Sequence, residues 1–136
     1  MVVYGCFETK ANSALPERLE LIYEHVAKLI EEHKPDEVAI EDLFFATNAK
    51  TAMSVGQARG VVLLACKHKR VPIFNYTPLQ VKSAVTGYGK ADKKQVEMMV
   101  VKILRLKEIP KPDDAADALA VALTHSATNT KLKGLQ

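Results

Sequence analysis

Short apolar segments alternate along the chain with longer segments of helical periodicity, and this order constrains the fold more than any other feature. Three short segments are rich in apolar and β-branched residues, which predicts strands: 2–7, 37–41 and 71–76. Helical spacing of apolar residues predicts helices at 16–33, 48–68, 77–86, 92–106 and 113–125. Strands that alternate with helices in this way are typical of an α/β domain.

Local start and stop signals support these boundaries. Pro16 stands where a helix tolerates a missing N–H, and Lys34-Pro35 ends the same helix. Thr77-Pro78-Leu79-Gln80 combines a capping box with proline at the first helical position. We therefore expect a helix that begins at Pro78.

Chain length and composition predict a single domain. The 136 residues, 48% of them hydrophobic, suffice for one core, which we place at 1–125 with a polar tail at 126–136. The sequence has no apolar run long enough to cross a bilayer and no apparent secretion signal at its start. Cys6 and Cys66 lack metal-ligand spacing, so we expect buried thiols in a reducing cytoplasm.

Charge is distributed unevenly along the chain. Segment 13–42 holds nine acidic residues against three basic ones, whereas segment 43–91 holds no acid and seven Lys or Arg residues. A surface without carboxylates does not repel a polyanion, which favours nucleic acid as a partner. The alternative interpretation is a solvated basic face that arises by chance.

The last predicted helix carries three aspartates in its first two turns. Asp113 is interpreted as a helix cap that complements the helix dipole. Asp114 and Asp117 share one face with Ala118 and Val121, and this small-residue face is expected to meet the sheet. Two carboxylates there would repel each other unless a cation lay between them, so we favour a metal site over a second cap.

Glu41 ends an otherwise apolar strand, at the edge where α/β sheets expose functional groups. A strand-end glutamate taken alone is more often a surface residue. Together with the two aspartates, however, it supplies the hard oxygen ligands that Mg²⁺ prefers. Two such ions about 4 Å apart promote phosphodiester hydrolysis.

Several motifs resemble the RuvC family of Holliday junction resolvases, in register from about residue 2 to His125. The two most specific segments are Gly56-Gln57-Ala58-Arg59-Gly60 and Asp114-Ala115-Ala116-Asp117-Ala118-Leu119-Ala120. The likeness also includes Ile40-Glu41-Asp42-Leu43-Phe44, Asn48-Ala49, Gln80-Val81-Lys82 and Gly87-Tyr88-Gly89.

The resemblance implies an RNase H-like mixed sheet flanked by helices, a homodimer, and cleavage of symmetric strands at a four-way DNA junction. It implies two Mg²⁺ ions per active site, with Mn²⁺ as a substitute, and a branch-migration motor as a partner. The metal ligands would be Glu41, Asp114 and Asp117. Lys82 and Lys93 would lie near the scissile phosphate, where a cation balances developing charge.

The resemblance also implies DNA contacts elsewhere in the chain. Phe44 falls where the family places an aromatic residue that stacks on bases near the crossover, although Phe44 or Phe45 is alternatively a core residue. Asn48 is a further implied DNA contact. Weaker candidates for phosphate contacts are Lys90, Lys94 and Arg70.

One part of the family pattern has no match. The family begins with two strands, the first bearing an aspartate, before the strand that matches 2–7. We therefore expect three carboxylates at the metal site instead of four, and a cleavage rate lower by orders of magnitude. Either the sequence is a truncated form or another segment fills the gap, and Asp42 is a poor substitute because it would point away from Glu41's side.

The leading hypothesis is thus a magnesium-dependent junction endonuclease of recombination and repair. A second hypothesis is a junction-binding module that lacks the first aspartate and does not cut. A third is an α/β enzyme or regulatory domain without a nucleic-acid role, but the Gly87-Tyr88-Gly89 loop follows a helix, so it is a weak phosphate-binding signal.

Overall fold

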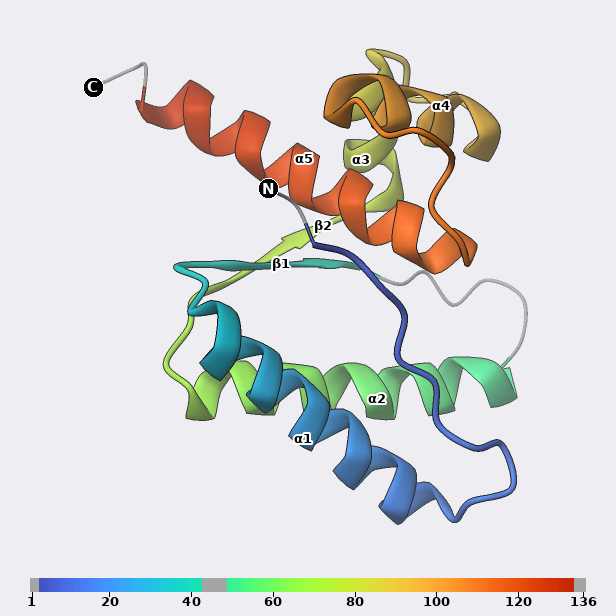
Figure 1. Ribbon diagram of the computed structural model, residues 1–136, viewed down its shortest axis with the longest axis vertical. Coiled ribbons are helices and arrows are strands. Elements are labelled where there is room, and N and C mark those ends of the chain that lie inside the picture. Colours follow the sequence, from blue (N-terminus) through green and yellow to red (C-terminus); the bar gives the residue numbers. More distant parts are fainter. Residues whose placement is uncertain (1–2, 43–48, 134–136) are drawn as a thin grey trace. The chain divides into compact units, whose positions relative to one another are not determined.

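The computed structural model describes residues 3–42 and 49–133 (Figure 1). Within these ranges the chain forms five helices and two strands. In chain order they are α1 (Leu15–His33), β1 (Val38–Glu41), α2 (Ala49–His68), β2 (Ile73–Tyr76), α3 (Pro78–Thr86), α4 (Lys93–Leu104) and α5 (Asp113–Lys133). The predicted α/β class is confirmed.

β1 and β2 are neighbours in a parallel two-stranded sheet. The Val38 N–H donates to the Pro72 carbonyl at 2.9 Å, and the Asp42 N–H donates to the Tyr76 carbonyl at 2.7 Å. Both strands advance in the same direction between these two bonds, so their carboxyl ends meet at one edge. Glu41 therefore stands at the edge where parallel sheets place functional groups.

The predicted strand at 2–7 is wrong over its described residues, because 3–7 have no regular secondary structure. The side chains of these residues are exposed, including Val3 at 71% and Cys6, so the prediction of a buried Cys6 is also wrong. A strand is stable when the backbone of a neighbouring strand pairs with its N–H and C=O groups. An apolar local sequence does not by itself provide that neighbour.

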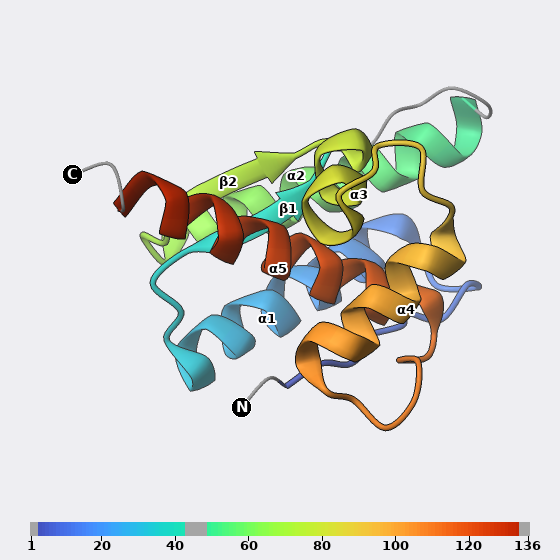
Figure 2. The ribbon, with the colours of Figure 1, turned by 90° about the horizontal axis from the view of Figure 1, so that it is seen from above.

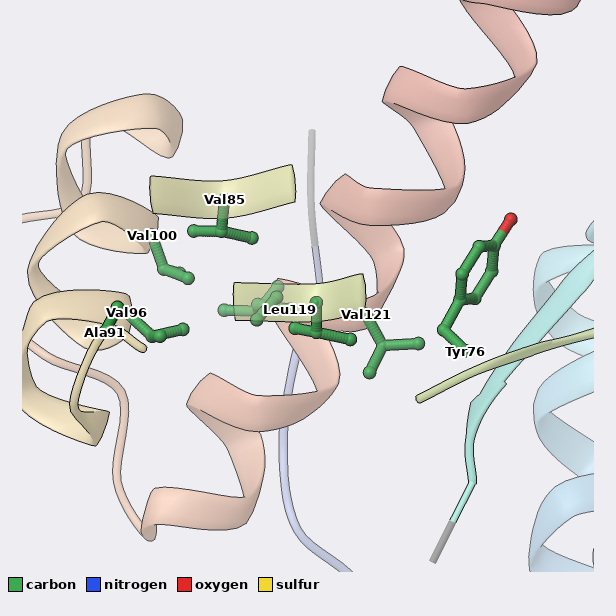
Figure 3. Packing of buried hydrophobic residues seen from close by; sticks show 9 residues of the cluster. Tyr76, Val85, Ala91, Val96, Val100, Leu119 and Val121 are labelled. Atoms are coloured by element: carbon green, nitrogen blue, oxygen red, sulfur yellow. The ribbon is translucent and has the colours of Figure 1, made fainter. Parts of the chain in front are cut away.

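The described residues form two compact units, and the first contains 3–6, 39–42 and 74–133. Helices α3, α4 and α5 pack against one another in this unit (Figure 2). Figure 3 shows its apolar core, which consists of Tyr76, Val81, Val85, Ala91, Val96, Val100, Leu119, Ala120 and Val121. Because each buried Val or Leu side chain contributes about 1.5–3 kcal/mol, this core fixes α5 within the unit.

The second unit contains 7–38 and 49–73, where α1 packs against α2. The Tyr23 hydroxyl and His68 Nδ1 are hydrogen-bonded at 2.6 Å, and Lys69 pairs with Glu31. Cys66 is buried, as predicted. These contacts join α1 to α2 and to the turn that follows it.

Helix starts follow the sequence signals closely. At the start of α3, Thr77 Oγ1 accepts from the Gln80 N–H at 3.2 Å, and Gln80 Oε1 accepts from the Thr77 N–H at 2.8 Å. The predicted capping box is confirmed, and α4 begins with a second one between Asp92 and Gln95. Each box satisfies backbone N–H groups that a helix start would otherwise leave without partners.

α5 continues to Lys133, so the predicted helix end near His125 is wrong. The Thr124 hydroxyl donates to the Ala120 carbonyl and the Thr128 hydroxyl to the Thr124 carbonyl, both at 2.8 Å. Polar side chains are thus satisfied inside the helix, and no Gly or Pro interrupts 113–133. None of the helices in the described ranges combines the length and apolar character needed to cross a membrane.

Candidate active site

A pocket of about 300 Å³ lies in the first unit, between the end of β1 and the first half of α5. Three carboxylates line it, those of Glu41, Asp114 and Asp117. The rest of its wall is apolar, formed by Ala39, Ile40, Ala118 and Val121. The predicted shared face of Asp114, Asp117, Ala118 and Val121 is confirmed, because all four line this one pocket.

Glu41 is partly buried, and its surroundings oppose its negative charge. Loss of solvation raises the pKa of the Glu41 carboxyl, and repulsion from Asp117 raises it further. The Lys93 and Lys82 ammonium groups act in the opposite direction. A site where burial and a neighbouring carboxylate raise the pKa of Glu41 is one that a bound cation would stabilise.

Lys93, the first residue of α4, bridges two carboxylates of α5. Its Nζ lies 3.2 Å from Asp113 Oδ2 and 3.4 Å from Asp117 Oδ2. The hydrogen bond that Lys93 donates to Asp113 is the largest cause of the raised pKa of Lys93, and the Asp117 charge also raises it. Lys93 is therefore held as an ammonium group at the rim of the acidic pocket.

The other predicted lysines are placed differently. Lys82 on α3 is partly buried and near enough to Glu41 to lower its pKa. Lys90 and Lys94 are exposed and do not belong to the described residues that line the pocket. Arg70 is exposed in the turn after α2, in the second unit.

Phe44 and Asn48, the predicted DNA contacts after β1, lie outside the described residues, as does Phe45. Asp42 directly follows β1, and its backbone bonds to Tyr76. Its side chain is not part of the pocket lining seen in the described residues.

The donor chemistry of the pocket fits a hard divalent cation, because Glu41, Asp114 and Asp117 offer carboxylate oxygens in one concave site. Across residues 3–42 and 49–133, however, no three acidic, His or Cys side chains are close enough together to hold a metal ion. Asp117 is instead engaged by Lys93. The three carboxylates thus line one pocket without forming such a group among the described residues.

Asp113 is a residue of this site that sequence reasoning missed. It was interpreted as a helix cap, yet it is the nearer of the two acceptors of Lys93. The available signal was its spacing, since Asp113 and Asp117 are four residues apart and so share a helix face.

Comparison with known proteins identifies the family of the chain. The family model described as crossover junction endodeoxyribonuclease RuvC matches residues 1–125. A protein of that name from Finegoldia magna is 57% identical over 122 residues, which cover 90% of this chain and 74% of the relative. The Clostridioides difficile protein of that name is 51% identical over 133 residues, covering 98% of this chain and 79% of the relative.

Solved structures show the same likeness. Thermus thermophilus RuvC has a TM-score of 0.85 at 40% identity, covering 92% of this chain and 75% of that chain. A second structure, T. thermophilus RuvC in complex with Holliday junction substrate, has a TM-score of 0.85 at 41% identity, covering 90% of this chain and 74% of that one. The predicted RNase H-like fold class is confirmed, and the chain belongs to the RuvC family of crossover junction endodeoxyribonucleases.

Proposed function

We propose that this protein is a structure-selective endonuclease that cuts symmetric strands of four-way DNA junctions in recombination and repair. The observation that carries the proposal is the single pocket lined by Glu41, Asp114 and Asp117 in a chain of the RuvC family. T. thermophilus RuvC has been solved in complex with Holliday junction substrate, which supports a junction as the substrate class here.

The catalytic roles follow from the chemistry of the pocket. Glu41, Asp114 and Asp117 would hold divalent cations, for which we propose two Mg²⁺ ions, with Mn²⁺ as a substitute. Such cations activate water and stabilise the leaving oxygen in phosphodiester hydrolysis. Lys82 and Lys93 place ammonium groups around the carboxylates, where they would attract the scissile phosphate and balance its developing charge.

DNA binding would extend beyond the pocket. We assign phosphate contacts to Lys90 and Lys94, base stacking to Phe44, and a further DNA contact to Asn48. Cutting two symmetric strands requires two active sites related by a two-fold axis, so we propose a homodimer. Residues 1–125 would form the resolvase domain, acting on DNA in the cytoplasm with a branch-migration motor as partner.

The test is a cleavage assay with Mg²⁺ on a synthetic four-way junction beside a linear duplex of the same sequence. Symmetric nicking of the junction alone is the expected result. Glu41→Gln should abolish nicking and leave junction binding nearly intact, because it removes a metal ligand without adding bulk. Cleavage by that variant at the wild-type rate would refute the role of Glu41.

A second candidate function is junction binding without cleavage. It is favoured by one observation, that no three potential ligands in the described part of the chain are close enough together to hold a metal ion. Tight junction binding with no nicking in either Mg²⁺ or Mn²⁺ would select this function. Binding that does not weaken with salt would reject both candidates, since phosphate contacts make affinity fall as salt rises.

A further inference from the structure

The Lys93 ammonium has two acceptors on α5, and one of them is a proposed metal ligand. Asp113 Oδ2 lies 3.2 Å from Lys93 Nζ, and Asp117 Oδ2 lies 3.4 Å away. Asp113 is the more exposed of the two, with 69% of its side chain accessible against 40% for Asp117. Asp117 belongs to the pocket lining, whereas Asp113 lies outside it.

Lys93 and a divalent cation would compete for Asp117. When a carboxylate coordinates a divalent cation, the cation neutralises its charge, so it attracts an ammonium group less strongly. The cation and the ammonium group also repel each other. If Asp117 were the sole acceptor, metal binding would release Lys93 from the pocket rim. Asp113 shares the helix face of Asp117 and retains its charge when Asp117 is occupied.

We propose that Asp113 is a positioning residue that holds the Lys93 ammonium beside the pocket and leaves Asp117 available for the metal. This inference rests on the proposed function, because it assigns Lys93 to the phosphate and Asp117 to the metal. It explains why α5 carries an acid one turn before Asp117, on the same face. In this proposal, the three aspartates of segment 113–117 have two roles: Asp113 is the positioning residue, and Asp114 and Asp117 are metal ligands.

A simple helix-dipole role for Asp113 is the competing explanation. An aspartate in the first helical turn stabilises the helix whatever Lys93 does. The two explanations differ in their dependence on Lys93. A positioning role disappears when Lys93 is removed, whereas a dipole role persists.

The first test uses the full chain without metal or DNA and observes the Lys93 side chain itself by ¹H–¹⁵N correlation of lysine ammonium groups. Hydrogen bonding slows proton exchange, so a resolved Lys93 signal is expected in the wild type, assigned by its loss in Lys93→Arg. An Asp117→Asn background, which leaves Asp113 as the remaining acceptor of the bridge, should keep the signal; there it should disappear on adding Asp113→Asn and persist on adding Asp113→Glu, which restores the carboxylate. Glu108→Gln removes one exposed charge outside the bridge and should leave the signal unchanged.

The second test is a double-mutant cycle on single-turnover junction cleavage. Asp113→Asn should slow cleavage by about fivefold or less, the range expected for an exposed charge pair, with junction affinity unchanged. In a Lys93→Met background the same change should have no further effect on the rate. Equal losses in both backgrounds would favour the dipole role.

The outcomes separate this inference from the proposed function. A wild-type Lys93 signal that is absent, that is lost in Asp117→Asn alone, or that survives the further change Asp113→Asn in that background overturns the positioning role whether or not the protein cuts DNA. A chain that fails to cut junctions overturns the proposed nuclease function. In that case, loss of the ammonium signal when Asp113→Asn is added to the Asp117→Asn background would still establish that Asp113 holds Lys93.

Discussion

The negative charge of Glu41, a proposed metal ligand, opposes the stability of the metal-free fold. Burial and the Asp117 charge raise its pKa above the ordinary value of 4.5. Between 4.5 and the raised pKa, the folded state binds more protons than the unfolded state. The stability of the metal-free protein therefore falls as pH rises through that window. Above the raised pKa, the whole destabilisation that the Glu41 charge causes is present.

Glu41→Gln should consequently stabilise the metal-free protein at pH 7 while abolishing cleavage. The gain should stay below about 1 kcal/mol, because the carboxylate is partly solvated. Urea unfolding at pH 7 and pH 4 measures it, and the difference between variant and wild type should shrink at the lower pH. A variant less stable than wild type at pH 7 would contradict this account.

The two thiols should react at very different rates in the native protein. Cys6 is exposed, whereas Cys66 is buried and burial raises the pKa of its thiol. Because the thiolate is the reactive form, a thiol reagent should modify Cys6 rapidly and Cys66 after unfolding. Cys6→Ser should remove the fast phase, and a fast phase that survives would place Cys66 within reach of solvent.

For single residues, the sequence predicts those positions that follow from the periodicity of one helix or strand. Glu41 ends a strand, and Asp114 and Asp117 share a helix face, so their common pocket was predictable. The bond between Asp113 and Lys93 was not, because it joins α5 to α4 and depends on how the two helices pack. The exposure of Cys6 was likewise not predictable from the sequence, because burial depends on the tertiary structure.

At the scale of elements, two glycines after α3 should tolerate alanine differently. Gly87 caps α3 with φ +76°, a left-handed conformation that costs a residue with a Cβ about 1 kcal/mol. A Cβ on Gly89 would meet Leu79 Cδ1 at 2.8 Å, but that atom ends an exposed, flexible side chain. Thermal unfolding should therefore show Gly87→Ala to be the more destabilising change, and the reverse order would contradict the capping argument.

The boundaries of helices and strands were predictable where a few consecutive residues determine them. The capping box at Thr77 places the start of α3 at Pro78, as predicted, because four consecutive residues satisfy its first backbone groups. The segment 3–7 lacks the predicted strand because strand formation needs a distant partner. The predicted end of α5 is wrong because the hydroxyls of Thr124 and Thr128 donate hydrogen bonds to backbone carbonyls of the same helix. A polar sequence can therefore continue the helix.

At the scale of the whole molecule, charge distribution predicts a salt-dependent interaction with DNA. Segment 43–91 contains no acid, so no carboxylate of its own repels a polyanion; Lys90 belongs to this segment, and Lys94 follows it after Asp92. Lys90→Ala and Lys94→Ala should each reduce the slope of log affinity against log salt by about 1, if each contacts one phosphate. Lys28→Ala, within the acidic segment and paired with Glu32 at 3.7 Å, is the matched control and should leave the slope unchanged.

The two capping boxes also have a consequence for the order in which the molecule folds. α3 and α4 are consecutive helices that contact each other, and each starts with its own box and ends at a left-handed residue, Gly87 or Arg105. Contacts between segments close in sequence form with little loop-closure cost, so this helical pair is expected to assemble in the folding transition state. The pairing of β1 with β2 spans the whole of α2 and should come later. The pocket is thus completed after its scaffold: Lys93 reaches its place early, and Glu41 joins it as one of the last residues to become ordered.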